Sequence, residues 1–202
     1  MPALAGVLFA LAVPLMARAD DWAAPRTREV FSASREWFVR VTPGGKRATA
    51  EFYRRAADRS YRLLTETPLL NPVAPVLFVV TDRGYLVTFD NWHNMGYGKA
   101  VASYAPDGRH VLAAELRDLF PAAQIASFRT SVSSIWWRTE TVYIRDGQQS
   151  VYVAMDDTGT SLLLEPETGA WQHCRWKGKD YLCRSSTVPD ARRPFVEPVL
   201  RK

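Results

Sequence analysis

The sequence has few of the residues that build metal or redox centres, with two Cys and three His among 202 residues. His93, His110 and His173 are dispersed, and no Cys or His pairs stand at the spacing of a zinc site. The chain also lacks a Gly-rich phosphate loop before a helix and a G-x-S-x-G nucleophile elbow. These absences remove the usual signals of several enzyme classes, and we expect no metal and no cofactor.

Strong charge of one sign is also absent. The formal net charge is +5 at pH 7, and the basic residues are scattered apart from a small cluster within 192–202. Proteins that bind nucleic acids usually concentrate such charge on one face or helix. We therefore expect no nucleic-acid partner, and at most a weak attraction to anionic envelope polymers.

Long apolar runs are missing after the first 19 residues, so no transmembrane segment is expected. Residues 4–16 are apolar and are followed by A-R-A at 17–19, a pattern typical of a secretory signal cleaved before Asp20. No Lys or Arg precedes the apolar run, and a buried N-terminal helix is the alternative interpretation. The pattern predicts a signal peptide at 1–19 and a periplasmic or secreted protein.

Short apolar runs separated by turn residues dominate the rest of the chain. From Ala74 to Leu116, four runs rich in Val, Tyr and Phe are separated by residues 82–84, 91–98 and 106–108. Such spacing predicts an up-and-down antiparallel sheet. Two further series of candidate strands flank it: Val30–Ser32, Trp37–Thr42, Thr49–Arg54 and Tyr61–Leu64 upstream, and Ile135–Arg138, Thr141–Arg145, Ser150–Met155 and Ser161–Glu165 downstream.

Each of the three sections has the form of a four-stranded meander of roughly 40 residues, a length typical of propeller blades. Closed propellers usually have about four to eight blades, so we predict an all-β fold of antiparallel four-stranded meanders in an incomplete or open propeller. A sandwich or a barrel is the alternative. Residues 20–184 should form one domain, and a Pro-containing extended tail should follow at 185–202. One helix is expected at Ala113–Ile125, broken by Pro121.

A resemblance supports this picture. The segments V-T-F-D-N-W at 87–92, G-Y-G at 96–98 and S-V-S-S-I-W-W at 131–137, with a turn at Asp107-Gly108, resemble a group of uncharacterised exported bacterial proteins with propeller-blade-like repeats. The resemblance implies a β-rich envelope protein and supplies no activity.

Cys174 and Cys183 flank the segment RWKGKDYL. A two-residue turn at Gly178-Lys179 would place the two cysteines directly opposite each other on a hairpin. Opposed Cα atoms lie about 4.5–5.5 Å apart, a distance that a disulfide spans. The spacing therefore predicts a disulfide in an oxidising compartment. Two free thiols are the alternative.

The sharpest catalytic signal is D-T-G-T-S-L-L at 157–163, which resembles the active-site loop of pepsin-like aspartic proteases. That resemblance implies a catalytic Asp157 beside Thr158 and Gly159. No second D-T-G or D-S-G is present, and Asp156 stands where the family usually has an apolar residue. An ordinary strand-joining turn is the alternative reading. An exported hydrolase of this kind remains the alternative function.

The loop at 90–98 is the candidate binding site, because binding residues often lie on loops that a rigid scaffold holds. Trp92 and Tyr97 would stack on a sugar or peptide, and Asp90, Asn91 and His93 would hydrogen-bond to it. The alternative is structural: Asp90 and Asn91 tie the turn, and Trp92 and Tyr97 pack against the next blade. Most other Trp residues lie beside apolar strand positions and are predicted to be core.

The leading hypothesis is a noncatalytic envelope module that binds a ligand or a partner protein. An incomplete ring leaves strand edges that need covering. The partner we expect is a second copy of the chain, in a homo-oligomer, or another envelope protein.

Overall fold

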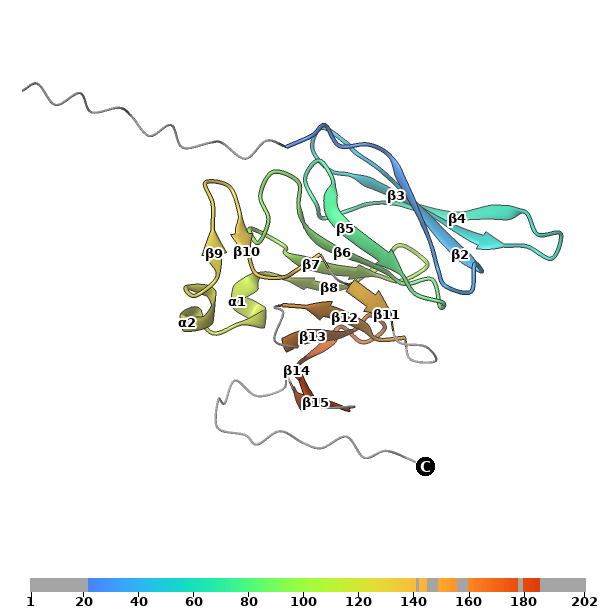
Figure 1. Ribbon diagram of the computed structural model, residues 1–202. Helices are drawn as coiled ribbons and strands as arrows, with labels where there is room; N and C mark the ends of the chain where they lie inside the picture. Colours follow the sequence, from blue (N-terminus) through green and yellow to red (C-terminus); the bar gives the residue numbers. More distant parts are fainter. Residues whose placement is uncertain (1–21, 141, 145–148, 156–159, 178–179, 186–202) are drawn as a thin grey trace, which may run out of the picture.

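The computed structural model describes residues 22–140, 142–144, 149–155, 160–177 and 180–185. They form three antiparallel meanders, one after another along the chain, and a short two-stranded sheet (Figure 1). Within these ranges none of the sheets closes on itself, so the predicted all-β, open propeller-like architecture is confirmed. The predicted signal peptide and, apart from Ser185, the predicted tail lie outside the described residues.

Strands that follow one another in sequence are neighbours in each large sheet. The first sheet comprises β1 (Arg28–Phe31), β2 (Trp37–Thr42), β3 (Thr49–Arg55) and β4 (Tyr61–Pro68). The second comprises β5 (Pro75–Val80), β6 (Leu86–Asn91), β7 (Val101–Tyr104) and β8 (His110–Ala114). The third comprises β11 (Val142–Ile144), β12 (Val151–Ala154), β13 (Thr160–Glu165), β14 (Ala170–Lys177) and β15 (Asp180–Ser185).

Two short helices and a small hairpin connect the second sheet to the third. They are α1 (Leu116–Leu119), α2 (Ala122–Ile125), β9 (Arg129–Thr130) and β10 (Ile135–Trp136). The prediction of a helix at Ala113–Ile125 is confirmed from Leu116 onward and in its break, whereas Ala113 and Ala114 belong to β8. The break occurs because Pro121 has no N–H to continue α1 and instead precedes α2.

The prediction that the third meander begins at Ile135–Arg138 is wrong. Strand β10 pairs with β9, and the third sheet instead gains the cysteine hairpin β14–β15 as its outer pair. The physical reason lies in the residues after β10. Trp137 and Arg138 are buried and hydrogen-bond to Asp90 of the second sheet, so this segment cannot serve as an edge strand of the third.

The second sheet is the middle layer of the molecule. Every residue of β6 and β7 is buried, because both faces of these strands are covered. One face packs on the first sheet in a core that includes Leu86 and Tyr104 beside Val39 and Phe52. The other packs on the third sheet, with core residues Val87, Phe89, Val101, Val151, Val153, Leu162 and Leu164. Burial on both faces explains why this section reads as nearly continuous apolar runs.

The cysteine hairpin has the register that the sequence predicts. Cys174 lies opposite Cys183, and Lys177 lies opposite Asp180. The two sulfur atoms are bonded at 2.07 Å, with Cα atoms 4.0 Å apart. The predicted disulfide is therefore present, while the turn at Gly178-Lys179 lies outside the described residues.

The disulfide closes a short loop, so its removal should have a moderate effect on stability. We expect the Cys174→Ser, Cys183→Ser double variant to lose about 2–3 kcal/mol of unfolding free energy, measured by urea denaturation. In the wild type, a thiol reagent added under denaturing conditions should detect no thiol before reduction and two after it. Two reactive thiols in unreduced protein would contradict the assignment.

Tyr104 is a buried phenol in the core between the first two sheets. Its hydroxyl oxygen accepts a hydrogen bond from the backbone N–H of Leu70 at 2.8 Å. Burial raises the pKa of Tyr104 to about 12, because the phenolate would be poorly solvated there.

This shift makes stability depend on pH in alkaline solution. The unfolded chain releases the phenol proton near pH 10, whereas the folded chain keeps it until about pH 12. The neutral Tyr104 phenol makes its full contribution to the free energy of unfolding below pH 10. About 2–3 kcal/mol of that free energy should be lost as the pH rises to 12. Urea unfolding across this range measures the slope. Tyr104→Phe should be less stable at pH 7, because the Leu70 N–H loses its acceptor. The free energy of unfolding of this variant should fall less steeply between pH 10 and pH 12. Equal slopes in the two proteins would show that Tyr104 does not have a raised pKa.

Candidate functional site

The candidate loop lies against the β9–β10 hairpin, so the two segments form one structural unit. The backbone N–H of Ile135 donates to the carbonyl oxygen of Met95 at 2.9 Å. Gly96 has φ +76°, and a Cβ atom at this position would lie 2.8 Å from the Cβ of Ile135. Glycine is therefore required for both the backbone conformation and the close approach of the hairpin.

Asp90 connects the loop and the segment after the hairpin to the second sheet. Its side chain is fully buried, and its backbone has φ +59°. Oδ1 accepts hydrogen bonds from Trp137 Nε1 at 2.7 Å and from the Gly96 N–H at 2.9 Å. Oδ2 accepts from Arg138 Nε at 2.7 Å in an ion pair whose side chains are 3% and 0% exposed. The carboxylate is therefore used to hold the hairpin and the loop on the second sheet.

Asn91 has a similar internal role. Asn71 Nδ2 donates to the Asp90 carbonyl oxygen and to Asn91 Oδ1, both at 3.0 Å. Asn91 Nδ2 in turn donates to the carbonyl oxygen of Tyr97 at 2.6 Å. Asp90 and Asn91 therefore hold the loop in place, which is the structural alternative given in the sequence analysis. Their side-chain polar atoms bond to other groups of the protein.

The remaining candidate residues lie nearer the surface. Trp92 is half-buried, and its Nε1 donates to the carbonyl oxygen of Ala23 at 3.2 Å. Its ring lies 5.5 Å from that of Trp22, which also contacts exposed His93 at 5.6 Å. Tyr97 is 45% exposed. The residues available to a ligand are therefore Trp92, His93 and Tyr97.

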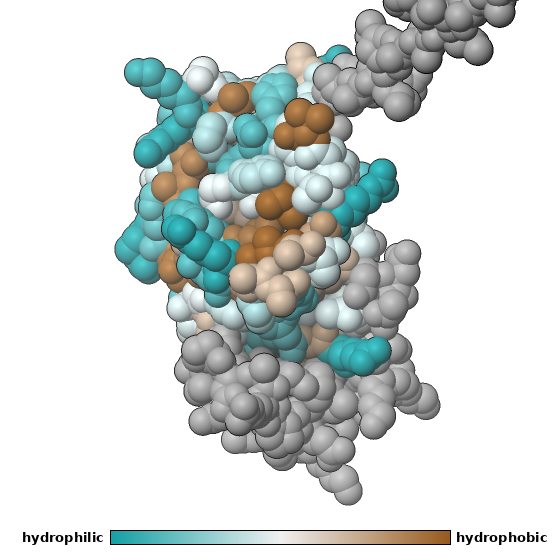
Figure 2. All heavy atoms as spheres, turned by 90° about the vertical axis from the view of Figure 1, so that its left-hand side faces the viewer, coloured by the Kyte–Doolittle hydropathy of each residue, from teal (hydrophilic) through white to brown (hydrophobic). Residues whose placement is uncertain are grey.

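Exposed apolar side chains accompany Tyr97 on this unit. Val132 at the hairpin tip is 78% exposed and Trp136 is 44% exposed. Trp136 departs from the core role predicted for most Trp residues, whereas Trp137 is fully buried, because successive residues of an extended chain point to opposite sides. We call Tyr97, Val132 and Trp136 the hairpin face. Figure 2 views the side of the molecule on which the β9–β10 hairpin lies, and apolar and polar residues alternate over this surface.

Sequence reasoning selected Asp90 but missed its partners Trp137 and Arg138, which lie 47 and 48 positions along the chain. The signal was weak but present. An aspartate lies near the end of an apolar strand, and an arginine directly follows the three apolar residues Ile135, Trp136 and Trp137. Each is a charged residue next to apolar residues that are expected to be buried. Burying an unpaired charge costs free energy, so each charge indicates a buried partner.

Within the described part of the chain, no group of three His, Cys, Asp or Glu side chains is arranged to hold a metal ion. Asp157, Thr158 and Gly159, the aspartic-protease-like triplet, lie outside the described residues. In the same described ranges, no helix has the length and apolarity to cross a membrane. No known protein family, curated protein or solved structure matches this chain.

The Asp90 network should make a large contribution to stability. Asp90→Ala leaves the Arg138 guanidinium buried without its partner, and we expect a loss of about 3–5 kcal/mol of unfolding free energy, measured by urea denaturation. Asp107→Ala is the control, because Asp107 is an exposed turn residue with its side chain 68% exposed. That variant should lose no more than about 1 kcal/mol.

A second variant separates charge burial from simple packing loss. Asp90→Ala combined with Arg138→Met removes both charges, and it should recover part of the lost stability. If Asp90→Ala were no more destabilising than Asp107→Ala, the ion pair would not hold the hairpin as described.

Proposed function

We propose that this protein is a noncatalytic binding module of the bacterial envelope, and that it contacts a partner protein through the hairpin face. The observation that carries the proposal is the exposure of Val132 and Trp136 on a hairpin fixed by the buried Asp90–Arg138 ion pair. Large apolar side chains left exposed on a fixed element are candidate interaction sites. Trp and Tyr are also enriched among the residues that dominate protein interfaces.

The rigidity of the hairpin supports the same role. Strands β9 and β10 have two residues each, and a hairpin of this size is not stable alone in water. Its position depends on the Asp90 contacts and on the Ile135 to Met95 hydrogen bond. A side chain held in place before binding loses little conformational entropy when the partner docks.

Export belongs to the proposal as well. The apolar N-terminal segment ending in A-R-A fits a signal peptide, and the Cys174–Cys183 disulfide fits an oxidising compartment. A relationship to the exported bacterial proteins with blade-like repeats is part of this same proposal. The compartment we propose is the periplasm or the outside of the cell.

Site-specific photo-crosslinking tests the hairpin face. A photoreactive amino acid placed at Val132 of the full chain, expressed in cells that make the protein, should give one discrete adduct. Trp136→Arg should remove that adduct without changing the melting temperature, because Trp136 is already 44% exposed. An adduct of twice the chain mass identifies a second copy, and any other mass identifies a different envelope protein.

Leu64 on β4 is the matched control, since it is an apolar side chain that is 52% exposed on another sheet. The same photoreactive residue at Leu64 should not give the adduct. The proposal fails if Val132 gives no adduct, if Leu64 gives it equally, or if Trp136→Arg leaves it unchanged.

A further inference from the structure

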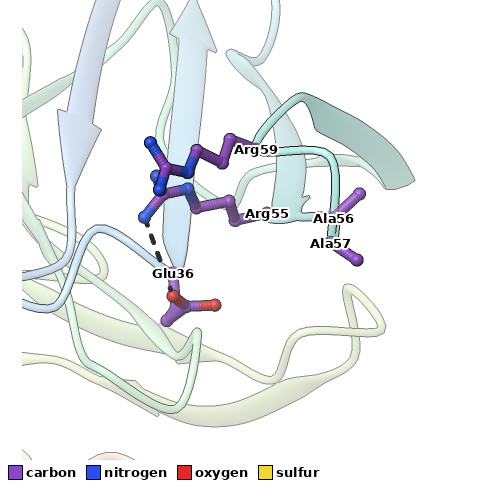
Figure 3. A pocket seen from close by; sticks show the side chains of 5 residues that line it. All are labelled: Glu36, Arg55, Ala56, Ala57 and Arg59. Carbon is purple, nitrogen blue, oxygen red and sulfur yellow. Dashed lines mark ion pairs between the residues drawn. The ribbon is translucent and has the colours of Figure 1, made fainter.

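A second site lies at one end of the first sheet, on elements that do not contribute to the hairpin face. There the residue before β2, the end of β3 and the β3–β4 turn enclose a surface hollow of about 390 Å³. We call it the arginine hollow. Figure 3 shows the side chains that line it, which are Glu36, Arg55, Ala56, Ala57 and Arg59.

Two guanidinium groups share this hollow with one carboxylate. In Figure 3, Arg55 and Arg59 extend side by side in the same direction, and the charged end of Arg55 faces Glu36. Arg55 Nη1 lies 4.0 Å from Glu36 Oε1, the outer limit of an ion pair. Among the described residues, Arg59 forms no ion pair with a carboxylate. The hollow therefore has an excess of positive charge.

The nearby aspartate does not cancel this charge directly. Asp58 Oδ1 accepts hydrogen bonds from the Ser60 N–H at 3.0 Å and from Ser60 Oγ at 2.6 Å. These bonds hold the pKa of Asp58 below its usual value. Asp58 Oδ2 lies 3.9 Å from Arg62, so its other oxygen faces a different guanidinium.

The turn keeps Arg59 in an unusual backbone conformation. Its φ is +66°, in the left-handed region where Gly and Asn are common. The conformation is held by hydrogen bonds from the Arg59 N–H to the Ala56 carbonyl oxygen at 2.9 Å and from the Ala56 N–H to that of Ser60 at 2.8 Å. These two hydrogen bonds fix the point from which the Arg59 side chain extends.

We propose that Arg55 and Arg59 together bind an oxyanion, the phosphate or carboxylate group of a ligand. Guanidinium groups present forked N–H donors that match such groups bidentately, and two adjacent forks are stabilised by an anion between them. Glu36 positions Arg55. The rings of Phe38 and Tyr53 on this sheet stack on each other at 4.3 Å, and Phe38 is only 6% exposed. The anion is either free in solution or part of a polymer.

Titration of the full chain with inorganic phosphate tests the site. The Nε–Hε NMR signals of Arg55 and Arg59 should shift with saturation, and Arg59→Gln should weaken binding about tenfold or more. Arg109→Gln removes the same charge from another turn, where the side chain is 65% exposed, and should leave binding unchanged. The second probe is polygalacturonate, a carboxylate polymer. If it competes with phosphate for the Arg55 and Arg59 signals, the anion is part of a polymer. If it does not compete, the anion is free in solution.

The Arg59→Gly variant separates a loss of binding from a loss of folding. Glycine accepts a positive φ, so this variant should melt at or above the wild-type temperature while losing the saturable shift. The proposal is overturned if neither probe gives a saturable shift, if Arg59→Gly binds like the wild type, or if Arg109→Gln weakens binding as much as Arg59→Gln. None of these outcomes depends on the hairpin face.

Discussion

The buried ion pair between Asp90 and Arg138 is the contact on which the candidate surface depends. Both charges are removed from water, and this cost is offset only when their hydrogen-bonding groups find partners. Trp137 and the Gly96 N–H provide those partners for Asp90. One carboxylate therefore connects the end of β6, the loop that follows it and the segment after β10. Without it, a hairpin of two-residue strands would have little to fix its position.

The middle sheet provides the rigid base for this arrangement. Strands β6 and β7 are buried on both faces, so Asp90, near the end of β6, extends from a strand that is covered on both sides. The first sheet covers one face, and the third sheet covers the other. The hairpin face is therefore held by a sheet that is itself fixed on two sides. The arginine hollow, by contrast, lies at the end of an outer layer.

Local patterns in the sequence were sufficient to predict most of the strands, the all-β class and the cysteine pairing, because each depends on residues close together in the chain. The start of the third meander was predicted wrongly, since Arg138 pairs with a carboxylate 48 positions earlier and no local pattern reports such a contact. The same limit applies to the loop. The sequence offers both Asp90 and Tyr97 as candidates to contact a ligand, and only the packed structure shows that Asp90 is buried and Tyr97 is 45% exposed.

The shared carboxylate also determines how the hairpin can move. Because Trp137 and Arg138 contact the same side chain, a partial shift of the hairpin would break both contacts and leave a buried charge without compensation. Any displacement of the hairpin from the second sheet is therefore costly, whether it is partial or complete. A partner that binds here meets Val132 and Trp136 on an element whose position is already set.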